Sequence, residues 1–253
     1  MQTTRKIAVA GATGRVGRHV AEILEAQGQA VVAMSRSQGI DVVSGDGLAD
    51  ALTGVDAIVD AASTPSPDQQ EATDFFSTAA RNLHEAGERA GVQRIVVVSI
   101  IGTDRFRGGY GAAKLVHEQA MLAGPIPTRI LRAAQFHEFV GQLVEWGTRG
   151  EVSYVQKMRM QPIAARTVAE GLVELAVDAD SAPQVSEIAG PREERLAELA
   201  KLLVARRGDA LRIEEVSDAD DPDRAVFEDG GPLPGPDATL AGPTFEEWLE
   251  AAH

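Results

Sequence analysis

The sequence contains no cysteine, which excludes disulfide bonds, thiolate metal sites and cysteine nucleophiles. Positive charge is also scarce, because 24 Lys and Arg stand against 38 Asp and Glu and give a net charge of −14. An acidic excess of this size argues against nucleic acid or an anionic membrane surface as a partner. No apolar run approaches the ~20 residues of a membrane-spanning helix. We therefore expect a small-molecule substrate, with no nucleic acid, membrane or metal bound.

The size and balance of the chain are those of a globular protein. Its 253 residues, 44% hydrophobic and 25% charged, are enough for one α/β domain with a small appendage. The first predicted strand starts at Ile7, which leaves no room for a secretory signal before it. We therefore expect a cytoplasmic enzyme or binding protein, and leave open whether it forms oligomers.

A glycine turn near the N-terminus organises the chain. Residues 7–10 are small and apolar, as expected of a strand buried on both faces. Gly11, Gly14 and Gly17 follow, and apolar residues then recur at helical spacing over 16–24. Glycines permit close approach of the backbone to a ligand, and the N–H groups at a helix start face a pyrophosphate. This order of strand, turn and helix predicts a dinucleotide site.

The end of the second predicted strand, 30–34, indicates which dinucleotide is bound. An acid there would bind the ribose 2′-hydroxyl of NAD, whereas a cation accommodates the 2′-phosphate of NADP. Arg36 stands between Ser35 and Ser37, and no acid occurs before Asp41. Arg15, inside the glycine turn, offers a second guanidinium that suits phosphate oxygens. The sequence therefore favours NADP(H).

Alternating strand and helix patterns predict an α/β fold with an open sheet. Further strands are expected at 40–43, 57–62, 94–99 and 128–132. Asp46, Ala61 and Ala62 would then lie at the carboxyl ends of strands, where open α/β sheets bind ligands. The predicted cofactor-binding residues are Gly11, Thr13, Gly14, Arg15, Val16, Gly17, Ser35, Arg36, Asp46, Ala61, Ala62 and Lys114.

The remaining patterns divide the chain into a dinucleotide-binding core, 1–150, and a smaller C-terminal substrate-binding region, 151–253. A long helix is expected over 71–91, with His84 expected to be a surface or helix-end group and given no role. The acidic, proline- and glycine-rich segment 217–236 is expected to be a mobile surface loop. Thr244 and Glu247 have the spacing of a capping box for a last helix, 244–252.

Tyr110 and Lys114 follow the loop after the strand 94–99 and lie four residues apart, on one face of a predicted helix. A free phenol has a pKa of about 10 and is a poor catalyst at neutral pH. A neighbouring ammonium would stabilise the phenolate and lower that pKa. The pair is therefore expected to protonate a carbonyl oxygen as hydride arrives, or to deprotonate an alcohol in reverse.

With these residues in place, the chain resembles the atypical short-chain dehydrogenase/reductase superfamily, in its NmrA-like group of NAD(P)-binding proteins. The resemblance covers nearly the whole chain and implies a Rossmann fold, with a doubly wound parallel sheet and a small C-terminal substrate region. The segments that carry it are 11–17, 97–102, Tyr110 with Lys114, 131–136 and 244–248.

The resemblance also implies roles for individual residues. Lys114 would bind the nicotinamide ribose, Tyr110 would be the acid, and the turn after 128–132 would cover the nicotinamide. Family members place a catalytic Ser or Thr just after the strand that ends at Ser99, often as the second of two hydroxyl residues. Here Ser99 is followed by Ile100, one position early. The predicted catalytic residues are Ser99, Tyr110 and Lys114, and the predicted substrate wall is Phe106, Phe136, His137 and Phe139.

Three functions are consistent with these residues. The first is an NADPH-dependent oxidoreductase that reduces a small, fairly apolar carbonyl or quinone. The second is a non-enzymatic NADP(H) sensor that reports redox state to a protein partner. The third is a nucleotide-sugar epimerase or dehydratase, with Arg149, Arg159 and Arg166 as candidates for holding a sugar diphosphate.

Overall fold

The computed structural model describes residues 4–66, 68–178 and 183–251. The chain forms two compact units that alternate along the sequence. The first comprises Met1–Ser99, Gly108–Arg132 and Val168–Ser186, and the second comprises Ile100–Arg107, Ala133–Thr167 and Glu187–His253. The expected boundary at residue 150 does not coincide with a boundary of these units, and the division into cofactor and substrate regions stays a prediction.

The fold is built on a seven-stranded parallel sheet, as the resemblance implies. The strand order is β12-β9-β5-β4-β3-β1-β2, and the order reverses direction between β1 and β3 in the manner of a doubly wound fold. The pairs β1–β2, β1–β3 and β3–β4 are parallel in register. The strands are β1 (Lys6–Ala10), β2 (Ala30–Met34), β3 (Ala57–Asp60), β4 (Arg94–Ile100), β5 (Thr128–Ala133), β9 (Val185–Ala189) and β12 (Thr239–Leu240).

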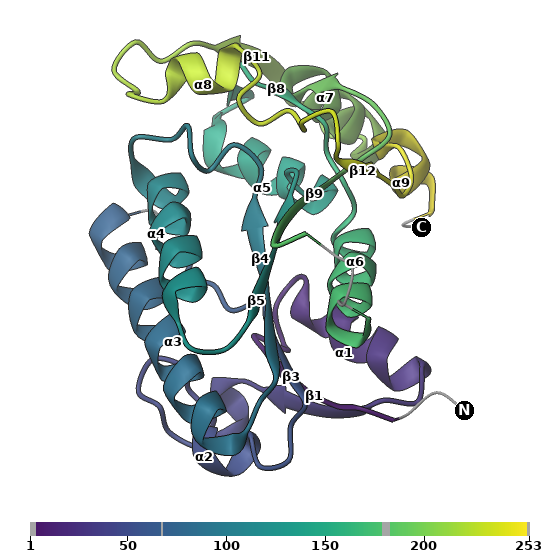
Figure 1. Ribbon diagram of the computed structural model, residues 1–253. Coiled ribbons are helices and arrows are strands. Elements are labelled where there is room, and N and C mark those ends of the chain that lie inside the picture. The colour runs from purple at the N-terminus through teal and green to yellow at the C-terminus, as the bar shows by residue number, and fades with distance from the viewer. Residues whose placement is uncertain (1–3, 67, 179–182, 252–253) are drawn as a thin grey trace. The chain divides into compact units, whose positions relative to one another are not determined.

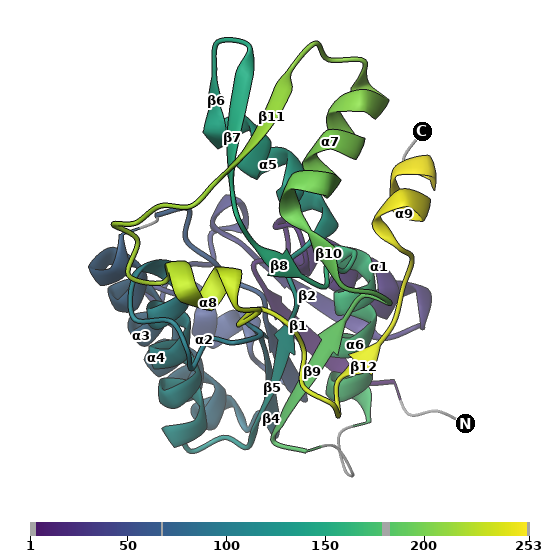
Figure 2. The same cartoon turned by 90° about the horizontal axis from the view of Figure 1, so that it is seen from above.

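Helices cover both faces of this sheet in the first unit (Figures 1 and 2). α3 and α4 lie side by side on one face, and α1 and α6 lie on the other. The helices are α1 (Gly17–Ala26), α2 (Leu48–Ala51), α3 (Gln69–Ala90), α4 (Gly109–Ala123) and α6 (Ala165–Val177), with a short 3₁₀ turn η1 (Arg36–Gln38). The predicted helix over 71–91 is confirmed as α3, which starts two residues earlier because the Asp68 carboxylate caps it through the Glu71 N–H.

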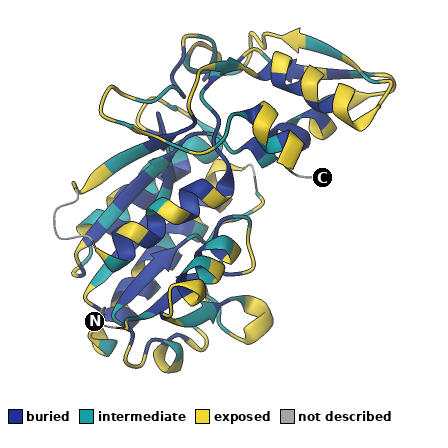
Figure 3. Cartoon of the chain, turned by 90° about the vertical axis from the view of Figure 1, so that its right-hand side faces the viewer, coloured by how far each residue is buried: buried dark blue, intermediate teal, exposed yellow. Residues whose placement is uncertain are grey.

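The core of the first unit lies between the sheet and its helices. Ile7, Ala8, Val9 and Ala10 of β1 are all fully buried, as a central parallel strand requires. Figure 3 shows buried residues concentrated in the sheet, with exposed residues on the outer sides of the helices. The core therefore fixes the carboxyl end of β1, from which the glycine turn departs.

The expected strand at 40–43 is wrong, since these residues form a turn. The Asp41 carboxylate accepts hydrogen bonds from the amides of Val43 and Ser44, and the Asp41 N–H donates to the carbonyl of Asp46. An aspartate that binds the amides ahead of it favours a turn over a strand. Asp46 is consequently exposed in a loop before α2 and does not lie at a strand end.

The second unit has its own small sheets and core. β7 pairs in parallel with β11 and antiparallel with β6, and β8 pairs with β10. Its core contains Val140, Val155, Leu199 and Phe245. Its elements, besides β12, are α5 (His137–Gly147), β6 (Thr148–Arg149), β7 (Val152–Gln156), β8 (Arg159–Met160), β10 (Glu194–Arg195), α7 (Leu196–Arg207), β11 (Arg212–Val216), α8 (Arg224–Glu228) and α9 (Phe245–Ala251).

The segment 217–236, predicted to be a mobile surface loop, has many exposed residues, and its mobility stays a prediction. It contains the short helix α8, and its buried Asp223 has one carboxylate oxygen 2.7 Å from the Arg107 amide nitrogen. A Cβ at Gly102 would collide with the carbonyl oxygen of Gly231, so these backbones meet closely. Among the described residues, no helix is both long and apolar enough to cross a membrane.

Candidate functional site

The glycine turn after β1 has a backbone that only glycine fits. Gly11 has φ +72°, and a Cβ there would lie 2.6 Å from the carbonyl oxygen of Ala61. A Cβ at Gly17 would collide with the carbonyl oxygen of Gly11. The turn is held to β2 by hydrogen bonds from the amides of Gly11 and Ala12 to the carbonyl of Met34. At the carboxyl ends of β1, β2 and β3, the backbone of the turn therefore contacts the backbone of the neighbouring strands directly.

The start of α1 is suited to an anion. Val16 occupies the N-cap and supplies no side-chain hydrogen bond, and the first turn carries no acidic residue. The amides of Arg18 and His19 donate to the carbonyls of Gly14 and Val16, and the helix dipole favours negative charge at this end. Thr13 and Gly14 are exposed in the turn, and Arg15 is half-buried. These residues fit the pyrophosphate of a dinucleotide.

Ser35 and Arg36 follow the end of β2, next to the glycine turn. Arg36 is exposed, and the hydroxyls of Ser35 and Ser37 lie 2.9 Å apart. Because Met34 is bound by the turn amides, this cation and these hydroxyls stand beside the proposed pyrophosphate site.

Tyr110, in the first turn of α4, reaches the loop that follows β3. Its phenol oxygen lies 2.9 Å from the Ser63 hydroxyl, and its ring packs edge-on against Phe76. Burial raises the pKa of Tyr110, the charge of Asp60 raises it further, and the Ser63 hydrogen bond offsets only part of this. The prediction that this phenol has a lowered pKa is therefore wrong. Tyr110 stays protonated at neutral pH.

Lys114, one turn further along α4, explains why the phenol pKa is not lowered. Its ammonium is buried and donates to the carbonyl oxygen of Val98 at 2.8 Å and to His117 Nδ1 at 2.9 Å. It also lies 4.6 Å from the centre of the Phe76 ring. Burial lowers the pKa of Lys114 to about 8, although Asp60 and Glu118 oppose this shift. The Lys114 ammonium is thus hydrogen-bonded to Val98 and His117 rather than to the Tyr110 phenol.

Ser99 does not meet Tyr110 through a hydrogen bond in the part of the chain described. It lies within β4, is 1% exposed, and its hydroxyl has no hydrogen-bond partner among the described residues. Ser63 provides the hydroxyl that contacts the phenol instead. The catalytic role of Ser99 stays a prediction.

Three residues of this region were absent from the predicted site: Asp60, Ser63 and His117. Two of them carry a signal in the sequence. Asp60 is an acid at the end of a wholly apolar strand, and His117 lies three residues after Lys114 on the same helix face. Both are 1% exposed and lie 3.1 Å apart. Ser63 has no comparable signal, since its contact with Tyr110 spans 47 residues.

The four residues predicted to wall the substrate lie in the second unit. Phe106 packs on Phe227, and Phe139 packs on Trp146. His137 is buried against Phe245 and Trp248, and its Nε2–H donates to the carbonyl of Pro243 at 3.1 Å. Phe136 forms a β-bridge with Ile163. Their role toward a substrate stays a prediction.

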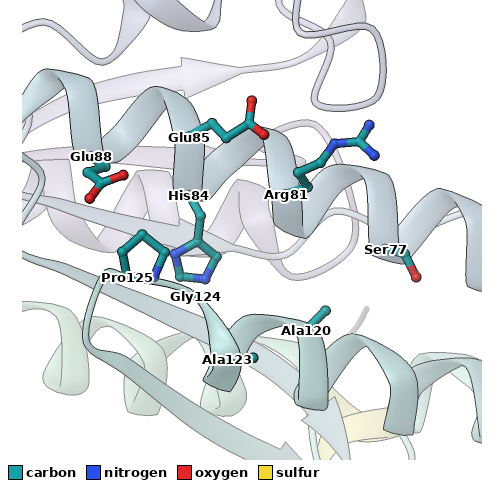
Figure 4. A pocket seen from close by; sticks show the side chains of 9 residues that line it. All are labelled: Ser77, Arg81, His84, Glu85, Glu88, Ala120, Ala123, Gly124 and Pro125. Atoms are coloured by element: carbon teal, nitrogen blue, oxygen red, sulfur yellow. The ribbon is translucent and has the colours of Figure 1, made fainter.

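A surface pocket lies between α3 and the end of α4, and neither Tyr110 nor Lys114 is among the residues that line it (Figure 4). His84 points into it toward Gly124 and Pro125, and it is 4% exposed rather than at the surface or a helix end as expected. Its Nε2–H donates to the carbonyl of Met121, and its Nδ1 accepts from the Ile126 N–H. Both ring nitrogens are used in fastening α4 to α3, which explains His84 without a ligand.

Comparison with known proteins agrees with this geometry. Residues 11–135 match a family model described as NAD(P)H-binding. A dTDP-4-dehydrorhamnose reductase from Bacillus anthracis, solved in complex with NADP, is 18% identical with a TM-score of 0.76, covering 98% of each chain. A short-chain dehydrogenase/reductase superfamily protein from Agrobacterium tumefaciens with bound NAD is 21% identical with a TM-score of 0.68, covering 98% of this chain and 96% of its own.

A UDP-N-acetylglucosamine 4-epimerase from Bacillus cereus is 20% identical with a TM-score of 0.71, covering 99% of this chain and 96% of its own. No curated protein matches the sequence. Residues 11–135 are thus similar to the NAD(P)H-binding family, and the solved structures share the fold of this chain over nearly its whole length. Of these solved structures, one holds NAD and another holds NADP, which leaves the choice of cofactor open.

Proposed function

We propose that this protein is an NADPH-dependent reductase of a small, fairly apolar carbonyl or quinone, of the NmrA-like kind. The observation that carries the proposal is the protonated phenol of Tyr110 beside the loop Ala61–Ala62–Ser63, which adjoins the glycine turn. A raised phenol pKa keeps a proton on this oxygen at neutral pH. That state suits a proton donor in reduction and does not suit a base that starts an oxidation.

The chain's own residues divide the work of binding. Gly11, Gly14 and Gly17 with the start of α1 hold the pyrophosphate, and Arg36 with Ser35 neutralises a 2′-phosphate. Asp46 does not lie at a strand end, but it is exposed in the loop before α2 and stays a candidate for contact with the nucleotide. The reduced nicotinamide, when bound, supplies a hydride, and Tyr110 protonates the substrate oxygen.

Tyr110→Phe tests the proposed acid, because it removes one hydroxyl and keeps the ring that packs on Phe76. We expect turnover to fall about 10²- to 10⁴-fold, the usual contribution of a positioned acid. The affinity for NADPH should change little. The measurement is NADPH oxidation against a panel of quinones and aldehydes, together with calorimetric titration of NADPH.

Tyr154→Phe is the matched control, since Tyr154 is the only other tyrosine and is 39% exposed on β7. Its turnover should equal that of the wild type. Undiminished turnover in Tyr110→Phe would show that this phenol is not the acid. NADPH binding without turnover of any compound would favour the sensor.

The nucleotide-sugar reading receives less support from the residues. An epimerase begins by removing a proton from a sugar hydroxyl, and a phenol with a raised pKa is a poor base for that step. Arg159, one candidate for the diphosphate, is engaged with Glu193 through two hydrogen bonds of 2.7 and 3.1 Å. Tightly held NAD in the purified protein would overturn this preference.

A further inference from the structure

Asp60 is a buried carboxylate at the junction of β3 with the loop that contacts Tyr110. One of its oxygens accepts the Ala62 N–H at 3.0 Å, and the other accepts His117 Nε2–H at 3.1 Å. Burial alone would raise the pKa of Asp60, but the hydrogen bond from His117 and the charge of Lys114 outweigh it and lower the pKa. Asp60 is therefore an anion that joins the proposed cofactor loop to α4.

The position of Asp60 fixes the tautomer of His117. Because Nε2 carries the proton given to Asp60, Nδ1 presents a lone pair, which accepts from the Lys114 ammonium at 2.9 Å. Burial and the charge of Lys114 lower the pKa of His117, so the ring is neutral. The ring is also stacked on Phe76, with centroids 4.7 Å apart. His117 cannot turn without losing all three contacts.

Two of the three N–H bonds of Lys114 are thereby assigned, one to His117 and one to the carbonyl of Val98. The other acid near Lys114 is Glu118, which is itself paired with Arg132 on β5 at 2.7 Å. Glu118 therefore already pairs with a cation, whereas Asp60 is linked to the Lys114 ammonium through His117. The ionisable groups around Lys114 are Asp60 on β3, Arg132 on β5, and Tyr110, His117 and Glu118 on α4.

We propose that Asp60 and His117 are positioning residues that hold the Lys114 ammonium charged and aimed, with one N–H left to bind the nicotinamide ribose. The inference rests on the proposed function for the identity of that ligand. The inference goes beyond the proposed function because it assigns the control of Lys114 to a buried carboxylate–imidazole pair. The same pair links the backbone of the loop at Ala62 to the ammonium.

Asp60→Asn tests the inference with little change of shape. The chain has four lysines, so the titration of Lys114 can be followed by ¹³C NMR of labelled lysine without any cofactor. In the wild type, Lys114 should lose its proton near its pKa of about 8. Removing the negative charge of Asp60 should move this titration to lower pH, because that charge favours the ammonium.

The affinity for NADPH gives the second readout. In the wild type the dissociation constant should rise as pH increases through about 8, where Lys114 loses its charge. In Asp60→Asn the rise should begin at lower pH, and near neutral pH binding should be about tenfold weaker, the value of one lost charge-assisted hydrogen bond. Lowering the pH should restore it, which a merely structural role would not produce.

His117→Phe is the second variant, since it keeps the stacking on Phe76 and removes both hydrogen bonds. This variant should move the titration of Lys114 to lower pH and should weaken NADPH binding, as Asp60→Asn does. His84→Phe is the matched control, because His84 is another buried histidine bonded only to backbone. It should reduce thermal stability without moving either pH profile.

The inference is overturned if both variants leave the Lys114 titration and the pH dependence of NADPH binding as in the wild type. Should the wild-type protein bind no nicotinamide cofactor, the proposed function fails. The NMR titration then still decides whether Asp60 and His117 control Lys114, because it needs neither cofactor nor substrate.

Discussion

Gly11 combines two separate constraints in one residue. Its φ of +72° is strained for any residue with a Cβ, and a Cβ would also press on the carbonyl oxygen of Ala61. Gly28, at the end of α1, has a similar φ of +75° with no atom near its missing Cβ. The two glycines therefore separate backbone strain from close approach.

Gly11→Ala is expected to abolish NADPH binding, because the turn must shift away from Ala61 to make room. Gly28→Ala should cost only the strain of a left-handed residue, about 1–2 kcal/mol, and leave binding intact. Calorimetric titration and chemical unfolding of both variants check this. Equal affinity in Gly11→Ala and wild type would show that the turn does not hold the cofactor.

At this scale the sequence predicts residues that act through local spacing. The glycine turn and the pair Tyr110 and Lys114 are visible because their members are three or four residues apart. The contacts of Asp60 with His117 and of Ser63 with Tyr110 span 57 and 47 residues, and only the fold brings them together. The pKa of Tyr110 was mispredicted for the same reason, because it depends on burial.

Among the elements, α9 shows how a short helix is stabilised at its start. The Thr244 hydroxyl accepts the Glu247 N–H at 3.2 Å, and the Glu247 carboxylate accepts the Thr244 N–H at 2.8 Å. This is the predicted capping box, with Phe245 and Leu249 buried below it. The predicted end of the helix at Ala252 lies outside the described residues.

Thr244→Ala should destabilise α9 by about 1 kcal/mol, the usual cost of losing an N-cap. Amide hydrogen exchange over the helix should accelerate about fivefold, which corresponds to that free energy. Glu250→Gln, an exposed change outside the cap, serves as the control. Unchanged exchange in Thr244→Ala would mean that packing alone holds this helix.

Strands and loops were predicted best where periodicity and burial agree. The strands at 94–99 and 128–132 are confirmed as β4 and β5. The first has a β-branched run that suits a buried parallel sheet, and the second buries Thr128, Ile130 and Leu131. The run 40–43 looked alike, yet the Asp41 carboxylate binds the next amides and makes a turn. Composition gives no sign of the short helix in 217–236 or of the contact between the Arg107 amide and the Asp223 carboxylate.

For the whole molecule, the proposed cofactor predicts a gain in stability on binding. A ligand at 100 times its dissociation constant stabilises the folded state by about 2.7 kcal/mol. The glycine turn, α1 and Arg36 all belong to the first unit, so this gain should appear in the unfolding of that unit. NADPH should give a larger gain than NADH if Arg36 neutralises the 2′-phosphate.

The melting temperature should therefore rise by about 5–10 °C with saturating NADPH, and by less with equal NADH. Arg36→Asp should reverse this order, because an acid at this position suits the ribose hydroxyl of NADH. Differential scanning calorimetry of both proteins with each cofactor makes the comparison. Identical shifts with the two cofactors would exclude discrimination by Arg36.

The alternation of the two units along the chain has a consequence for how the protein is made and degraded. The backbone passes from one unit to the other five times, at 99/100, 107/108, 132/133, 167/168 and 186/187. No single cleavage releases either unit whole, and no uninterrupted fragment encodes one. The ribosome must synthesise the last segment, Glu187–His253, before the second unit is complete. Until then, the second unit lacks part of its sequence and cannot finish folding.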